Sequence, residues 1–250
     1  MSMSSNRRGE SLEVIYGLNW ISAVEVWDIL FQVLKRIGIS LETPVDCFGK
    51  NVIPDNLHEC IQKANRGHFG FDLDGLSIHY SPVGNYEHAL LMVKDSSESA
   101  RYDWDQWVHA LLADTEVMQA WVVNNEYDHW QNAYDPIQYL GEDRSCEGLP
   151  MISNNLPPPL EKMIIDTSNN PGRRIIRMGY VEAIGSPMWL GRPFWERTGA
   201  DKKSVMEAFA KDAQLMENEV VRIQVSDKPF TENTDPALQN RLRQMLYPGG

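Results

Sequence analysis

One segment near the amino terminus carries the full set of signals that begin and end an amphipathic helix. Ser22 and Glu25 have the spacing of a capping box, in which the hydroxyl accepts from an early backbone N–H and the carboxylate reaches back. Apolar residues then recur at helical spacing as far as Ile37, and Gly38 offers a stop. We therefore predict a helix over residues 23–37 that packs one face against the rest of the protein.

Further helices and strands alternate along the chain without a regular βαβ order. Pro171 and Gly172 fit the central positions of a type II turn, so we expect a hairpin over residues 162–185. The β-rich segment 117–123 is interpreted as a strand, with a continued helix as the alternative. Hairpins mixed with isolated helices favour an α+β fold with a mainly antiparallel sheet and flanking helices. The other predicted helices cover residues 55–65, 103–114, 201–216 and 235–247, and the other predicted strands cover residues 12–18, 76–80, 87–93 and 220–225.

No internal repeat or low-complexity linker divides the 250 residues, so we predict a single α+β domain over residues 10–250. Residues 1–9 contain no apolar stretch, which indicates a disordered leader and not a secretory signal. The Pro- and Asn-rich segment 141–161 is interpreted as a long surface loop, with a domain boundary as the alternative. No apolar run approaches the roughly 20 residues that a membrane-spanning helix needs.

Charge and cysteine content narrow the classes of function. The chain has 23 basic and 35 acidic residues, a formal net charge of −12 and a pI near 4.9. Such a protein is repelled by phosphate backbones, so direct nucleic-acid binding is not expected, whereas a basic protein is attracted. The alternative is that acidity only keeps the protein soluble. Three widely spaced cysteines suit no disulfide framework and favour reduced thiols in the cytoplasm.

Local signatures of catalysis and cofactor binding are missing from the sequence. It contains no phosphate-binding loop, nucleophile elbow, dinucleotide fingerprint or paired-histidine zinc motif, so no cofactor is expected. The six histidines never recur at helical spacing with one another, so no metal is expected. Asp128, His129 and Asp135 are close enough in sequence to serve as acid/base groups of a hydrolase, which is the enzymatic alternative.

Aromatic rings and carboxylates are concentrated in residues 102–107 and 126–139. Tryptophan and tyrosine anchor protein interfaces, and neighbouring carboxylates complement a basic partner. We therefore predict one outward-facing, acidic and aromatic interaction surface. The alternative is that the rings belong to the core and the acids merely flank them. The residues predicted to contact the partner are Tyr102, Trp104, Asp105, Glu126, Tyr127, Asp128, Trp130, Tyr134 and Asp135.

A further aromatic stretch, GSPMWLGRPFWERTGAD, covers residues 185–201. Two tryptophans and a phenylalanine stand among three glycines and two prolines, so we expect an irregular backbone there. Irregular segments on a scaffold often present binding residues. A hydrophobic plug over an open end of the sheet is the alternative.

Three of these features together resemble a known group of proteins. The first strand with GLNW, the capped helix SAVEVWDILFQVLKRI and the MWLG and FWE stretch are similar to immunity proteins of bacterial polymorphic-toxin loci. Within that group the chain most resembles the immunity protein 52 family, in organisation and composition and without an invariant motif. The resemblance implies a cytoplasmic protein without catalytic activity that covers the active site of a type VI secretion nuclease. The remaining alternative is a structural or adaptor protein without a toxin partner.

Overall fold

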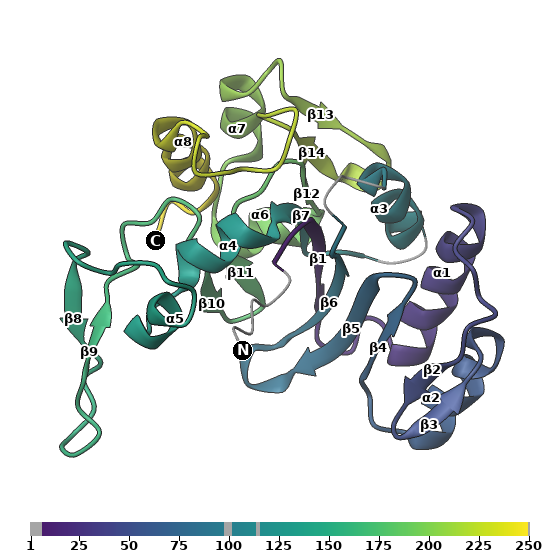
Figure 1. The fold of residues 1–250 in the computed structure, drawn as a ribbon. Helices are drawn as coiled ribbons and strands as arrows, with labels where there is room; N and C mark the ends of the chain where they lie inside the picture. The colour runs from purple at the N-terminus through teal and green to yellow at the C-terminus, as the bar shows by residue number, and fades with distance from the viewer. Residues whose placement is uncertain (1–6, 98–101, 114–115, 250) are drawn as a thin grey trace.

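The computed structural model describes residues 7–97, 102–113 and 116–249, and its centre is an eight-stranded sheet (Figure 1). The strand order is β13-β14-β12-β7-β1-β6-β5-β4, and every neighbouring pair is antiparallel. This arrangement confirms the predicted α+β class with a mainly antiparallel sheet. The strands are β1 (Glu10–Gly17), β4 (Phe69–Leu73), β5 (Leu76–Val83), β6 (His88–Asp95), β7 (Gln119–Asn124), β12 (Met188–Leu190), β13 (Ala213–Leu215) and β14 (Val221–Ile223).

Side chains of the central strands alternate between two apolar cores, one on each face of the sheet. Leu12 and Val14 of β1 face the first core, whereas Ile15 faces the second. The first core is covered by α1 (Ala23–Arg36), α2 (Leu57–Ala64) and α3 (Trp104–Ala113). The second is covered by α4 (Asn125–Asn132), α6 (Arg192–Thr198), α7 (Lys202–Ala208) and α8 (Pro236–Leu246).

Two-stranded ribbons lie outside the central sheet. One of them, β8–β9, follows the short helix α5 and points away from the body of the molecule (Figure 1). These smaller elements are β2 (Val45–Cys47) with β3 (Lys50–Val52), α5 (Pro136–Leu140), β8 (Met151–Ser153) with β9 (Met163–Ile165), and β10 (Ile175–Arg177) with β11 (Tyr180–Glu182). Short 3-10 turns lie at Pro54–Asn56, Gly84–Tyr86 and Glu217–Glu219.

The helix predicted over residues 23–37 is present as α1, and both halves of its capping box form. The N–H of Glu25 donates to Oγ of Ser22 over 3.2 Å, and the N–H of Ser22 donates to the Glu25 carboxylate over 2.8 Å. Trp27 and Leu34 are buried, and Gly38 follows with a φ of +78°. The predicted helices α2, α3 and α8 and the strands β1, β5, β6 and β14 are also present, and residues 119–124 form a strand and not a helix.

Two predicted elements near the middle and end of the chain are wrong. The helix expected over residues 201–216 ends at Ala208, because residues 213–215 pair with β14 as an edge strand. The hairpin expected over residues 162–185 does not form either. Its first strand pairs with β8, and its last two strands pair with each other around Gly179, whose φ is +82°.

The stretch over residues 185–201 also differs from the expectation of irregular backbone. It forms β12 and α6, and Trp189 and Phe194 are fully buried in the first and second cores. A Cβ at Gly191 would lie 1.8 Å from the carbonyl oxygen of Val117. Only glycine allows this close approach to the chain that leads into β7. The aromatic residues therefore build both cores and do not form a binding loop.

The last residues of the predicted leader are held by the folded protein. The backbone N–H of Asn125 donates to the carbonyl oxygen of Gly9 over 3.0 Å, and its side chain donates to that of Arg8 over 2.9 Å. Residues 1–6 lie outside the described residues. The three cysteines form no disulfide. Within the described ranges, no helix combines the length and apolar character needed to cross a membrane.

Candidate interaction surface

The nine residues predicted for the interaction surface lie on both faces of the sheet. Tyr102, Trp104 and Asp105 lie at the start of α3, which covers the first core. Residues 126–130 belong to α4, which covers the second core. Because the eight-stranded sheet separates these two helices, the structure does not join the two segments into one surface (Figure 1).

The predicted residues at the start of α3 contact other residues of this chain. Trp104 is only 6% exposed, and its Nε1–H donates to the carboxylate of Glu10 over 2.8 Å. Asp105 accepts two hydrogen bonds from the guanidinium of Arg222, each of 2.6 Å. Such a two-point pair neutralises the carboxylate and fixes its orientation. The prediction that the ring of Trp104 faces outward is therefore wrong.

The rings of α4 are also buried, which corrects the same prediction for Tyr127 and Trp130. The hydroxyl of Tyr127 donates to the side-chain oxygen of Gln239 in α8 over 2.8 Å. Trp130 packs against Tyr139 with ring centroids 4.8 Å apart, and the guanidinium of Arg144 lies 4.3 Å from a Trp130 ring centroid. Intramolecular partners thus occupy both rings, and they hold α4 and α5 to the body of the protein.

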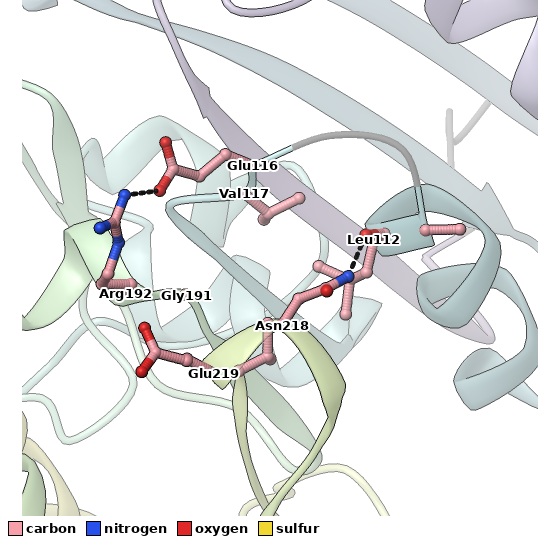
Figure 2. Close-up of a pocket in the computed structure, with 9 residues that line it drawn as sticks. Leu112, Glu116, Val117, Gly191, Arg192, Asn218 and Glu219 are labelled. Atoms are coloured by element: carbon pink, nitrogen blue, oxygen red, sulfur yellow. Dashed lines mark hydrogen bonds and ion pairs between the residues drawn. The ribbon is translucent and has the colours of Figure 1, made fainter.

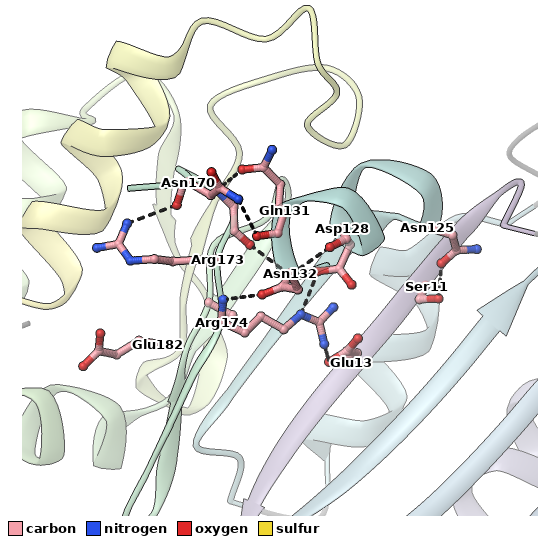
Figure 3. A network of polar contacts seen from close by, with 12 residues as sticks. Ser11, Glu13, Asn125, Asp128, Gln131, Asn132, Asn170, Arg173, Arg174 and Glu182 are labelled. Atoms are coloured by element: carbon pink, nitrogen blue, oxygen red, sulfur yellow. Dashed lines mark hydrogen bonds and ion pairs between the residues drawn. The ribbon is translucent and has the colours of Figure 1, made fainter. Parts of the chain in front are cut away.

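Asp128 belongs to a polar network between α4, β1 and the segment before β10 (Figure 3). Nη1 of Arg174 lies 2.6 Å from the carboxylate of Glu13, and Nε donates to Asp128 over 2.7 Å. The backbone N–H of Arg174 donates to Oδ1 of Asn132 over 2.7 Å. Nearby, the N–H of Gly172 donates to the side chain of Gln131 over 2.9 Å. The Pro-Gly pair predicted as a hairpin turn therefore lies in the segment that packs against α4.

Charge is unevenly balanced in the network, because one guanidinium faces two carboxylates. Burial raises the pKa of Asp128 to about 6, with the charge of Arg174 lowering it and that of Glu13 raising it. Burial opposes the charge of Arg174, but the two carboxylates raise its pKa above the ordinary value. Arg174 therefore stays charged, and a proton on Asp128 relieves the excess negative charge.

The hydrolase alternative requires Asp128, His129 and Asp135 to converge, and they do not. Asp128 is bound to Arg174, whereas Asp135 lies 2.6 Å from Nζ of Lys162. Nε2 of His129 is buried without a hydrogen-bond partner, and burial lowers the pKa of this imidazole. Within the described ranges no hydrogen bond links any two of the three, and no cluster of three His, Cys, Asp or Glu side chains is placed to hold a metal ion.

Two of the nine predicted residues are exposed, Glu126 and Tyr134, and Tyr102, Asp105, Asp128 and Asp135 are half-buried. The side chain of Asp135 accepts from the N–H of Ile137 over 3.1 Å, and Gln138 completes a capping box that begins α5. Tyr134 is 55% exposed. We name residues 134–165 the projecting arm, which consists of α5, the loop after it, β8, its turn and β9.

The projecting arm holds most of the exposed large hydrophobic side chains of the described chain. It is about one eighth of the sequence, yet it carries eight of the fourteen large hydrophobic side chains that are exposed. Concentrated apolar exposure marks interaction sites. The predicted surface does not include most of the arm, because it was based on aromatic rings next to carboxylates. The leucines isolated within the Pro-rich segment 141–161 were a usable signal for the arm. The eight are Tyr134, Ile137, Leu140, Met151, Ile152, Leu156, Leu160 and Met163.

An open pocket of about 680 Å³ lies between the end of α3, the start of α6 and the turn at Glu217–Glu219 (Figure 2). On its wall Glu116 forms an ion pair with Arg192 over 3.0 Å, and Asn218 donates to the carbonyl oxygen of Leu112 over 3.3 Å. Glu116, Arg192 and Asn218 are all engaged within the protein, so the pocket does not present the convergent set of free groups that orients a small ligand.

Comparison with known proteins adds information about the fold. The sequence matches no protein-family model and no curated protein. Its structure is similar to a solved structure, the "Pseudomonas aeruginosa T6SS protein PA0821", with a TM-score of 0.53 and 14% sequence identity. The match covers 96% of this chain and 72% of that chain. At this identity the likeness establishes a shared fold over nearly the whole of the chain.

Proposed function

We propose that this chain is a cytoplasmic immunity protein that binds and neutralises a cognate antibacterial toxin, a nuclease effector of type VI secretion. The observation that carries the proposal is the fold shared with a T6SS protein over 96% of the chain. The resemblance of the first strand and helix to immunity proteins of toxin loci supports the same class. The expected partner is a protein, not nucleic acid.

The proposed mechanism is occlusion of the toxin's active site. A nuclease has to bind a polyanion, so its substrate groove is expected to be basic. This chain has a net charge of −12, which favours rapid encounter with such a groove. The inhibitor itself catalyses nothing in this scheme. The ion pairs of Asp128 with Arg174 and of Asp135 with Lys162 support that view, because they engage the two carboxylates that the hydrolase alternative would need.

Co-expression with the product of the adjacent gene tests the proposal. We expect the chain to restore growth of cells that express this toxin, to co-purify with it, and to abolish its nuclease activity at a one-to-one ratio. An unrelated acidic protein of similar size and charge is the control for unspecific attraction.

The stoichiometry separates inhibition from enzymatic protection. Protection by a small fraction of one equivalent would show that the chain is an enzyme and would overturn the proposal. Failure both to rescue growth and to co-purify would overturn it as well.

A further inference from the structure

The tip of the projecting arm is held in one shape by the side chain of Asn154. Its oxygen accepts from the N–H groups of Leu156 and Lys162 over 3.2 and 3.1 Å, and its Nδ2 donates to the carbonyl oxygen of Leu160 over 3.0 Å. Prolines 157–159 lie between the two leucines, and their rings fix φ. The tip therefore presents leucine side chains that are 49% and 65% exposed from a stiff frame.

The base of the projecting arm is fixed to the body of the protein. Trp130 and Ile165 are buried together in a small third core. The N–H of Ile165 donates to the carbonyl oxygen of Tyr134 over 2.8 Å, and the ion pair between Asp135 and Lys162 links the tip to α5. With both ends fixed, a partner would have little chain to order, which lowers the entropic cost of binding.

None of the residues that the structure describes covers the apolar surface of the arm. Strands β8 and β9 pair with each other and with no other described strand. A two-stranded ribbon on its own is marginally stable in water, and exposed apolar edges invite association. The arm is also about the size of one side of a standard protein interface, which takes roughly 20–30 residues. Its size and exposure both fit a docking element.

The charges of the arm indicate which kind of partner it fits. Residues 134–165 contain five acidic and two basic side chains, and both basic ones, Arg144 and Lys162, pair with acids of this chain. A second copy of the arm would place like charges together, so charge complementarity favours a basic protein. Three exposed carboxylates have no basic partner among the described residues: Asp143, Glu147 and Glu161.

We propose that the projecting arm is the docking element of this chain. The tip leucines and the outer face of α5 enter an apolar cleft on a basic protein, and the three free carboxylates meet the basic rim of that cleft. The inference rests on the proposed function, in which the basic protein is the toxin. It locates the contact on one segment, residues 134–165.

A matched pair of double variants tests the apolar part, with the adjacent-gene toxin as the probe. Ile137→Ser with Leu160→Ser removes two side chains of the arm that are 72% and 65% exposed. We expect about a hundredfold weaker binding, mainly through faster dissociation. The control, Ile53→Ser with Leu215→Ser, changes side chains that are 41% and 52% exposed elsewhere and should bind like the wild type. Unfolding curves show whether each variant is folded.

A pair of charge-reversal variants tests the contact between the three carboxylates of the arm and the basic rim of the partner's cleft. The triple variant Asp143→Lys, Glu147→Lys and Glu161→Lys should associate about tenfold more slowly at low salt, and the difference should shrink at high salt. The control, Glu42→Lys with Asp72→Lys and Glu196→Lys, changes three exposed acids outside the arm and makes the same change in net charge. An equal effect of both variants would show that only total charge matters and would overturn the proposed rim.

The outcomes separate the docking proposal from the proposed function. If the wild type forms no complex with the toxin, both fail. If the wild type binds and the arm double variant binds as tightly, the function stands and the arm is not the docking element. If the wild type is a dimer that the arm variant converts to a monomer, the occupant is a second copy, which overturns the basic partner.

Asn154→Ala tests whether the rigidity of the tip contributes to binding. This variant keeps the apolar side chains of the arm but removes the hydrogen bonds that fix the tip, so we expect it to bind more weakly than the wild type.

Discussion

Helix α4 and the projecting arm have similar compositions and opposite environments. Both combine aromatic or aliphatic side chains with carboxylates, and they follow each other directly in sequence. In α4 the ring of Trp130 is buried and Asp128 is ion-paired. In the arm, Ile137 is 72% exposed and Asp143 has no basic partner among the described residues. The same kind of sequence thus serves the interior in one segment and faces solvent in the next.

The difference in burial between α4 and the arm depends on which residues, distant in sequence, contact each segment. Three arginines contact α4: Arg7 and Arg144 lie over the ring of Trp130, and Arg174 binds Asp128. They come from the first described residues, the arm and the segment before β10. Within the described part of the chain, no comparable set of residues covers the outer side of the arm. Composition alone therefore could not distinguish an internal contact from an interaction surface.

The largest effect is expected from removing Arg174, the residue that sets α4 apart. Arg174→Met leaves Glu13 and Asp128 as buried carboxylates without their shared cation. Breaking a buried ion pair in this way costs about 3–5 kcal/mol, so the free energy of unfolding should fall by about that amount. Urea unfolding at pH 7 measures it.

Arg192→Met is the matched control, because Arg192 pairs with Glu116 at the surface with 62% of its side chain exposed. It should change the free energy of unfolding far less than Arg174→Met does. Similar losses in the two variants would show that the Arg174 network contributes no more than a surface pair.

A smaller effect on the free energy of unfolding is expected from removing one aromatic ring in α4 and one in the projecting arm. Trp130→Ala removes a buried ring and should lower the free energy of unfolding by about 3 kcal/mol. Tyr134→Ala removes a ring that is 55% exposed, and the loss should stay within about 0.5 kcal/mol. Thermal unfolding of the pair measures both values. Equal losses would mean that the two rings are equally embedded in the fold.

Local signals in the sequence predicted those elements whose causes are local. The capping box and apolar spacing of α1, and the Asp-Pro start of α8, operate within a few residues, and both helices are present as predicted. The helix expected over residues 201–216 failed because pairing between Ala213 and Ile223 overrides local helix propensity. Strand pairing of this kind depends on a residue ten positions away and is not visible in a short window.

The candidate site was predictable only in part. Of the predicted partner-binding residues, Tyr134 and Asp135 belong to the projecting arm, and their contact with a partner stays a prediction. The burial of Trp104 depends on Glu10, and the pairing of Asp128 depends on Arg174, and neither partner is near in sequence. A single sequence does not reveal such contacts. It does show leucines isolated among prolines and asparagines, and this pattern is the better indicator of the exposed surface.

A loss of stability smaller than the one expected for Trp130→Ala comes from the titration of Asp128. In the folded protein burial raises its pKa to about 6, while an aspartate in an unfolded chain titrates near about 3.9. Well below pH 4, Asp128 is protonated in both the folded and the unfolded state, so it costs no stability. As the pH rises from 4 to 6, the unfolded state releases its proton first, so the folded wild type loses stability. Above pH 6 the loss is constant.

Asp128→Asn removes this titration and keeps a side-chain oxygen that can accept from Arg174. The free energy of unfolding of the wild type, relative to this variant, should therefore fall by about 2 kcal/mol between pH 4 and pH 7. This figure is lower than the whole pKa shift would give, because the Asp128 side chain is partly exposed to solvent. Urea unfolding of both proteins at several pH values measures the difference. A wild type that instead gains stability over the variant as the pH rises would show that the attraction of Arg174 outweighs burial. In that case the α4 network would be a net stabilising ion pair, and its contrast with the unpaired acids of the arm would be larger than proposed.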